Sequence, residues 1–266
     1  MNGLNNIQEL TSVNNPKIKQ WAQLLTRKGR EAQGKYLLEG THLVQEALQA
    51  GAPVEAILFQ VDKGLPPELA GLAHGTAEWY AVPEPVLAKC SETKTPQGIV
   101  AVVAKAGSGA EAWLYAEDAL VVAVDGVQDP GNLGTIIRAA DAAGATGVVL
   151  GAGTVDLYSP KTVRATMGSL FHVPVVSADL PALLAEAGRR GIRTVTARLD
   201  AKQTIYEADL AGPVWLILGN EGAGVSAEAA ALATDSVLIP MRGQSESLNV
   251  AMAATVLLYE AMRQRG

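Results

Sequence analysis

Hydrophobic positions in the first part of the chain alternate between helical and strand spacing. In NPKIKQWAQLLTRK, the residues Ile18, Trp21, Leu24 and Leu25 recur at intervals of three and four, as in an amphipathic helix. Short apolar runs at YLL, VEAILF, EWYAV and GIVAVVA predict strands. Further helices are expected at HLVQEALQA, with Thr41 as N-cap, and at PEPVLAKCSE. Alternating strands and helices indicate a small α/β domain over residues 1–105.

The same alternation is clearer in the second half of the chain. Strands are expected at 119–125, 147–150, 173–176, 192–197, 214–218 and 236–239. Helices are expected at 134–143, 160–169, 180–190, 226–233 and 248–264. Near-continuous apolar strands such as VWLILG are typical of a parallel sheet covered on both faces. The small and polar segment 106–118 has the composition of a linker, so a second α/β domain is predicted over residues 119–266.

Composition excludes several classes of protein. The chain has 266 residues, 48% apolar and 18% charged, and no apolar run approaches the roughly 20 residues of a membrane span. The N-terminal segment has no basic start followed by an apolar block, so no secretory signal is expected and the predicted location is the cytoplasm. One cysteine, Cys90, and three histidines without zinc-ligand spacing predict neither a disulfide nor a metal site.

Charge is unevenly distributed. The net charge of −6 argues against nonspecific coating of nucleic acid, which needs many basic side chains. Residues 1–105 carry 10 basic and 10 acidic side chains, whereas residues 106–266 carry 11 and 17. Within residues 11–38, six basic residues face one acidic residue, Glu31; the six are Lys17, Lys19, Arg27, Lys28, Arg30 and Lys35. This segment is either a phosphate-binding face or a solvated helix surface.

Three loops that follow predicted strands carry candidate chemistry, because ligands of open parallel sheets bind at the carboxyl ends of the strands. In DGVQDPGNLGTIIR, Asn132 can bond a ligand, and Arg138 lies one helical turn beyond Gly134, although such an arginine can equally form a salt bridge. The G-x-G-x-x-G order is missing, which disfavours a nicotinamide dehydrogenase. LGNEGAGVS presents Glu221 on a glycine-rich turn, and in IPMRGQSESLNVA either Ser245 or Ser247 is expected to cap the last helix.

Taken together and in order, Asn132 with Arg138, Asn220 to Gly222, and Ser247 to Asn249 resemble the three motifs of the SpoU (TrmH-like) branch of the SPOUT RNA methyltransferases. The resemblance covers residues 119–266. The N-terminal stretches LTSVNNPKIK, KYLLEGTHLVQEAL and TPQGIVAVV are similar to the substrate-binding domain that precedes the catalytic domain in many members.

The resemblance implies transfer of a methyl group from S-adenosylmethionine to a ribose 2′-hydroxyl of structured RNA. It favours 23S ribosomal RNA, with tRNA as the alternative substrate and a non-catalytic RNA-binding protein as the other alternative. It also implies a deep trefoil knot and a homodimer with the terminal helix in the interface and the active site completed across it. By the same analogy the adenosyl site is lined by Leu218, Gly219, Asn220, Gly222, Ile239, Met241 and Leu248.

The expected catalytic residues are Arg138, Asn132, Glu221, Ser247 and Asn249. An arginine with a pKa above about 12 is a poor base, so Arg138 is expected to hold the phosphate beside the target ribose and to stabilise the developing alkoxide. The two asparagines and Ser247 would then fix geometry, while Glu221 either orients Arg138 or accepts a proton through water. RNA contacts are expected from the basic residues of the 11–38 segment and from Arg164.

Overall fold

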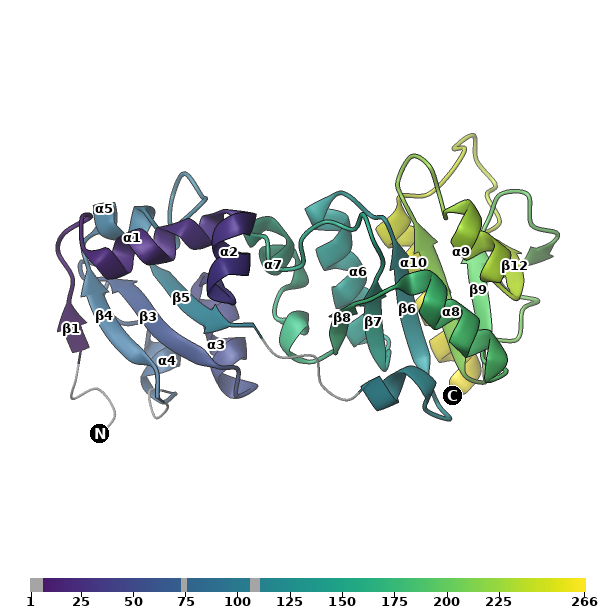
Figure 1. Ribbon diagram of the computed structural model, residues 1–266, viewed down its shortest axis with the longest axis horizontal. Coiled ribbons are helices and arrows are strands. Elements are labelled where there is room, and N and C mark those ends of the chain that lie inside the picture. The colour runs from purple at the N-terminus through teal and green to yellow at the C-terminus, as the bar shows by residue number, and fades with distance from the viewer. Residues whose placement is uncertain (1–6, 73–75, 106–110) are drawn as a thin grey trace. The chain divides into compact units, whose positions relative to one another are not determined.

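The computed structural model describes residues 7–72, 76–105 and 111–266 (Figure 1). Its contacts divide the chain into two compact units. Unit 1 contains Met1–Gly107 and Asp156–Phe171, and unit 2 contains Ser108–Val155 and His172–Gly266. Residues 156–171 therefore pack with the first unit, although the sequence analysis grouped them with the rest of 119–266. Local hydrophobic patterns show which residues are buried but not the core in which they are buried, so this placement was not predictable.

Unit 1 contains a mixed five-stranded sheet in the order β1-β4-β3-β5-β2, in which β5 is antiparallel to β2 and β3. Its strands are β1 (Ile7–Glu9), β2 (Lys35–Glu39), β3 (Val54–Gln60), β4 (Glu78–Val82) and β5 (Ile99–Ala104). Its helices are α1 (Pro16–Ala22), α2 (Arg27–Gln33), α3 (Thr41–Gln49), α4 (Pro67–Ala70), α5 (Glu84–Ala88) and α7 (Pro160–Thr166). Neighbouring residues of β2 enter different cores: Leu37 joins one cluster and Leu38 the other. The sheet is thus covered on both faces.

The first helices differ in detail from the predicted pattern. α1 continues as a 3₁₀ turn over Gln23–Leu25, and the backbone becomes extended at Thr26, whose hydroxyl accepts the Gly29 N–H. A second helix, α2, starts there and ends at Gly34, which has a φ of 62°. Gly40, rather than the expected Thr41, occupies the N-cap position of α3. The single expected helix is therefore two helices, because an N-capping threonine restarts it.

Unit 2 contains a seven-stranded sheet in the order β10-β12-β9-β11-β6-β7-β8, and every pairing in it is parallel. Its strands are β6 (Leu120–Asp125), β7 (Gly147–Leu150), β8 (Val175–Ser177), β9 (Arg193–Ala197), β10 (Gln203–Thr204), β11 (Val214–Gly219) and β12 (Asp235–Leu238). Its helices are α6 (Pro130–Ala142), α8 (Leu180–Arg189), α9 (Ala227–Leu232) and α10 (Val250–Arg265). The prediction of a parallel α/β sheet is confirmed.

Helices cover both faces of this sheet (Figure 1). Trp215 and Ile217 of β11 share a core with residues of α8 and α9, whereas α10 packs against α6 and β11. Trp215 is fully buried, and its indole N–H donates to the Leu114 carbonyl at 3.1 Å. Among the described residues, the structure has no helix long and apolar enough to cross a membrane and no cluster of three metal-ligating side chains.

Candidate active site

A pocket of about 580 Å³ opens at the carboxyl ends of β9, β11 and β12. It lies where ligands of open parallel sheets bind, and its volume suits a small organic molecule. Its wall includes the seven residues that the sequence analysis assigned to the cofactor: Leu218, Gly219, Asn220, Gly222, Ile239, Met241 and Leu248. Glu221, Ser247 and Asn249 also line it. The second and third motif loops, far apart in sequence, thus form one cavity.

The turn at the end of β11 is held by Asn220. Its side-chain oxygen accepts the N–H groups of Gly222 and Ala223 at 2.9 Å each, and its side-chain nitrogen donates to the Gly126 carbonyl at 2.9 Å. Gly219 is buried against the same turn: a methyl group added there would lie 2.1 Å from the Gly224 carbonyl carbon. Asn220 therefore shapes the pocket wall, and only a residue without a side chain fits at position 219.

Glu221 links this turn to the start of α6. Its carboxylate accepts the backbone N–H groups of Gln128 at 3.0 Å and Asp129 at 2.9 Å, and the Asn132 side-chain amide at 2.9 Å. Burial raises the pKa of Glu221, but the hydrogen bonds from Asn132, Asp129 and Gln128 outweigh burial, and its pKa lies below the usual value. An ionised carboxylate that accepts three hydrogen bonds is suited to holding the loop and is a weak base.

Asn132 and Asn249 connect the first and third motifs. The Asn249 amide donates to the Asn132 side-chain oxygen at 3.0 Å, while the Asn249 oxygen accepts the Ala251 N–H at 2.9 Å as N-cap of α10. The expected capping role of Ser245 or Ser247 was wrong: the Ser245 hydroxyl donates to the Ser247 carbonyl, two residues before the helix cap. Glu221, Asn132 and Asn249 form a continuous network through all three motifs.

Arg138 lies on α6, whose first residue is Pro130 rather than the expected 134. Its side chain is exposed, has no hydrogen-bond or ion-pair partner among the described residues, and is outside the pocket lining. The structure shows no contact between Glu221 and Arg138, so the expectation that Glu221 orients this arginine is corrected. Glu221 instead bonds the α6 N-terminus, while the Arg138 guanidinium remains available to an anion.

The six basic residues of the 11–38 segment divide into three groups. Arg30 is 4% exposed and bonds Asp156, so its predicted contact with RNA is corrected: a buried, paired guanidinium does not reach a phosphate. Ion pairs join Lys17 to Glu78, Arg27 to Glu31 and Lys35 to Glu55. Lys19 and Lys28 are exposed, with no ion pair in the described part of the chain.

Arg164 also differs from its expected role. It belongs to α7 in unit 1, where its guanidinium pairs with Glu92 at 3.2 Å and Glu39 at 3.8 Å, and its side chain is 27% exposed. Such pairing neutralises its charge and holds it away from free solvent. The net basic charge available to a polyanion is therefore smaller than the sequence count indicates.

Sequence reasoning missed two contributors to the site. Asp129 caps α6 by accepting the Asn132 N–H at 2.9 Å, and the D-P dipeptide was a usable signal because proline is favoured directly after the cap. Ala197, Arg198 and Leu199 line the pocket beyond the end of β9. Their position after a strand of the parallel sheet was the signal.

Comparison with known proteins decides the family. The model of the SpoU rRNA Methylase family matches residues 119–259, which include all three motif loops, and the MRM3-like substrate binding domain model matches residues 15–101. The chain belongs to the SpoU rRNA methylase family. The pocket and the Glu221–Asn132–Asn249 network lie within the SpoU match.

Two curated relatives and one solved structure are similar to this SpoU family member over nine-tenths or more of their length. A 23S rRNA (guanosine(2553)-2′-O)-methyltransferase of Bacillus subtilis is 39% identical, with 95% of this chain and 98% of the relative covered. A 23S rRNA (uridine(2479)-2′-O)-methyltransferase of Streptomyces viridochromogenes is 34% identical over 94% and 91%. The crystal structure of the SpoU methyltransferase AviRb from the same organism, in complex with AdoMet, superposes with a TM-score of 0.86 at 35% identity, covering 95% and 98%.

Proposed function

We propose that this protein is an S-adenosylmethionine-dependent methyltransferase that methylates a ribose 2′-hydroxyl of 23S ribosomal RNA. The observation that carries the proposal is the pocket at the strand ends, with its motif loops joined through Glu221, Asn132 and Asn249. The two relatives above are named for a guanosine and a uridine. Their shared target is thus the ribose hydroxyl, and we propose the same chemistry here.

The pocket fits the adenosyl cofactor in shape and polarity. Leu218, Ile239 and Leu248 supply apolar wall, and the glycine-rich backbone of residues 219–224 permits close approach to a ligand. Glu221 supplies an ionised carboxylate at the pocket edge, and its hydrogen bonds hold its pKa below the ordinary value for glutamate. A negative charge there favours a sulfonium cation over neutral ligands of similar shape.

S-adenosylmethionine bound in this pocket would supply an electrophilic methyl group to the ribose oxygen and would leave as a neutral thioether. The chain's contribution is to hold the hydroxyl in line and to favour loss of its proton. Arg138, exposed and unpaired in the described structure, would bind the adjacent phosphate and stabilise the developing alkoxide. Because three hydrogen bonds and a lowered pKa make Glu221 a weak base, we assign the proton to solvent water.

We further propose a homodimer that pairs through α10 and completes the active site across the interface. Support comes from three apolar side chains on this helix, Met252, Tyr259 and Met262, which are 55%, 45% and 38% exposed. They are separated by seven and three residues and so form one stripe. A deep trefoil knot, formed by the loops after β11 and β12, completes the proposed architecture; support comes from the common pocket that these loops line.

RNA recognition is proposed to use unit 1, with Lys19 and Lys28 as exposed cations and Lys17, Arg27 and Lys35 as paired ones. The proposed location is the cytoplasm, where a ribosomal substrate is made. Ribosomal RNA is favoured over tRNA because the two relatives described above, each matched over more than nine-tenths of this chain, are named for 23S rRNA.

The test is transfer of radiolabelled methyl from S-adenosylmethionine to protein-free ribosomal RNA and, separately, to bulk tRNA, each from cells that lack this protein. Label in 23S RNA that survives alkali as a dinucleotide establishes 2′-O-methylation. Label confined to tRNA would reject the proposed substrate. Cofactor binding without transfer to either RNA, or to assembled ribosomal subunits, would support the non-catalytic alternative.

A further inference from the structure

The segment 156–171 belongs to unit 1 by packing and to unit 2 by sequence. Val163 of α7 is 1% exposed inside the core cluster that contains Tyr36, Leu38 and Val44. Tyr158 packs against the same cluster, with its ring centroid 4.7 Å from that of Tyr36. Leu170 and Phe171 also contact this core. Unit 1 is therefore built partly from residues that lie between β7 and β8 of the methyltransferase sheet.

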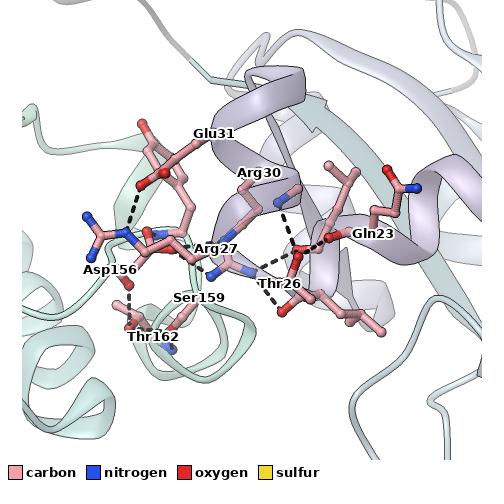
Figure 2. Close-up of polar contacts among 12 residues, drawn as sticks. Gln23, Thr26, Arg27, Arg30, Glu31, Asp156, Ser159 and Thr162 are labelled. Carbon is pink, nitrogen blue, oxygen red and sulfur yellow. Dashed lines mark hydrogen bonds and ion pairs between the residues drawn. The ribbon is translucent and has the colours of Figure 1, made fainter.

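A buried ion pair holds the start of the segment. The Arg30 Nη2 and Nε donate to Asp156 Oδ2 at 2.6 and 3.0 Å, while Nη1 donates to the Leu24 and Leu25 carbonyls at 2.8 and 2.9 Å. Figure 2 shows Arg30 pointing at Asp156, whose backbone carbonyl accepts the Thr162 hydroxyl. The Arg30 and Asp156 side chains are 4% and 17% exposed. A buried ion pair adds little net stability, and its usual benefit is a fixed register between the parts it joins.

The change from one unit to the other occurs between consecutive residues. Val155 belongs to unit 2, where its N–H donates to the Val127 carbonyl at 2.9 Å, and Asp156 is held by Arg30 in unit 1. Val127 directly precedes Gln128 and Asp129, whose N–H groups bind Glu221. At the other end, Phe171 packs in unit 1 and the next residue, His172, belongs to unit 2.

The chain consequently passes between the units three times, after residues 107, 155 and 171. At the crossings after Val155 and Phe171, the residues on both sides are held by contacts within their own unit. Val155, the last residue before the second crossing, is hydrogen-bonded to Val127 in the loop that positions Asn132.

We propose that residues 156–171 are a docking segment that couples the substrate-binding unit to the first motif loop, with Arg30 and Asp156 as positioning residues for methyl transfer. The positioning role rests on the proposed function; the docking role does not. Displacing this segment would release Asp156 and disturb its neighbour Val155, whose N–H holds the Val127 carbonyl beside the first motif loop. Arg30 thus acts on the reaction without touching RNA.

The test compares full-length Arg30→Met, Arg30→Lys and Asp156→Asn with Arg27→Met, which removes an exposed ion pair on the same helix. Hydrogen exchange across 156–171 is measured first. Arg30→Met should accelerate exchange there about tenfold or more, while Arg27→Met should stay within about twofold. Unchanged exchange in Arg30→Met would overturn the docking role. If Arg30→Met does not fold, Arg30→Lys and Asp156→Asn decide the question, because each keeps one member of the pair intact.

Kinetics then test positioning. Arg30→Met should lower kcat on 23S RNA by about 10- to 100-fold, as expected for misplaced reactants, with Arg30→Lys intermediate. Cofactor affinity should remain within about twofold of wild type because Arg30 does not line the pocket, a pattern that general destabilisation would not produce. A wild-type kcat in Arg30→Met would overturn the positioning role. A wild-type protein that methylates no RNA would reject the proposed function, while the exchange result would still decide the docking role.

Discussion

Substitution of Gly219 by alanine tests whether the turn after β11 forms the cofactor wall. The new methyl group would lie 2.1 Å from the Gly224 carbonyl carbon and from the Val225 nitrogen, whereas ordinary contacts begin at 3.4 Å. The backbone would have to move by roughly 1.3 Å, the difference between these distances, because backbone atoms have no rotamer with which to yield. Overpacking of this kind costs about 1–3 kcal/mol.

The expected outcome has two parts. At about 2–4 °C per kcal/mol, the melting transition of unit 2 should fall by roughly 2–12 °C. The Kd for S-adenosylmethionine, measured by titration calorimetry at a temperature where the variant is folded, should rise at least about tenfold, equivalent to 1.4 kcal/mol. Binding suffers because the displaced residues 219–224 line the pocket.

Two other glycines serve as matched controls. A methyl group on Gly222, in the same turn, meets nothing closer than 3.7 Å, so Gly222→Ala should retain stability. Gly243 has open space around it and does not line the pocket, so Gly243→Ala should retain both stability and affinity. Wild-type melting and affinity in Gly219→Ala, or an equal loss of stability in Gly222→Ala, would refute the reasoning.

Three further outcomes are expected. Arg138→Ala should reduce methyl transfer at least about 100-fold with S-adenosylmethionine affinity unchanged, because Arg138 lies outside the pocket lining; calorimetry showing weakened cofactor binding would contradict this assignment. Deletion of residues 1–105 should expose Val163, Tyr158 and Phe171 and so destabilise the remaining chain, which would bind a hydrophobic dye and melt at a lower temperature. A further Val163→Ser change should reduce the dye signal. A truncated protein as stable as the full chain would count against the docking segment. Hydrogen bonds from Arg263 lower the pKa of Glu260 to about 2, so the stabilising contribution of Glu260 is present above pH 4.5 and is lost as the pH falls towards 2. Glu260→Gln should therefore flatten the decline of the unfolding free energy between pH 4.5 and 2. An unchanged slope of unfolding free energy against pH would argue against the ion pair.

Much of the fold could be predicted from the spacing of hydrophobic residues and from the composition of the chain. The central strands β6 and β11 of unit 2 are near-continuous apolar runs, which suit a sheet buried on both faces, and the structure pairs them in parallel. Helix starts were less accurate. The first helix of unit 2 was expected to start at residue 134, yet Asp129 caps a helix that starts at Pro130, because proline has no N–H to leave without a partner in the first turn.

The errors at the site have a common physical cause. A basic residue in the sequence does not show whether its charge faces water, and Arg30 is buried because Asp156, far along the chain, compensates it. The unit to which α7 belongs also depends on contacts far along the chain, because an apolar residue such as Val163 could be buried in the core of either unit. Ser245 and Ser247 were the expected caps of α10, and only the observed chain path shows that Asn249 is the cap.

The central position of Asn132 in the network follows from its amide chemistry. The side chain must donate to Glu221 and accept from Asn249 at the same time, which a carboxamide does with one rotamer. An aspartate could only accept, and would place a second negative charge 2.9 Å from the Glu221 oxygen at which the amide now lies. A serine would be too short to bridge the two partners. Asn132 is 89 residues from Glu221 and 117 residues from Asn249 in the sequence, so its amide joins three distant segments into one site. A reaction catalysed mainly by positioning depends on such a fixed arrangement more than on a base.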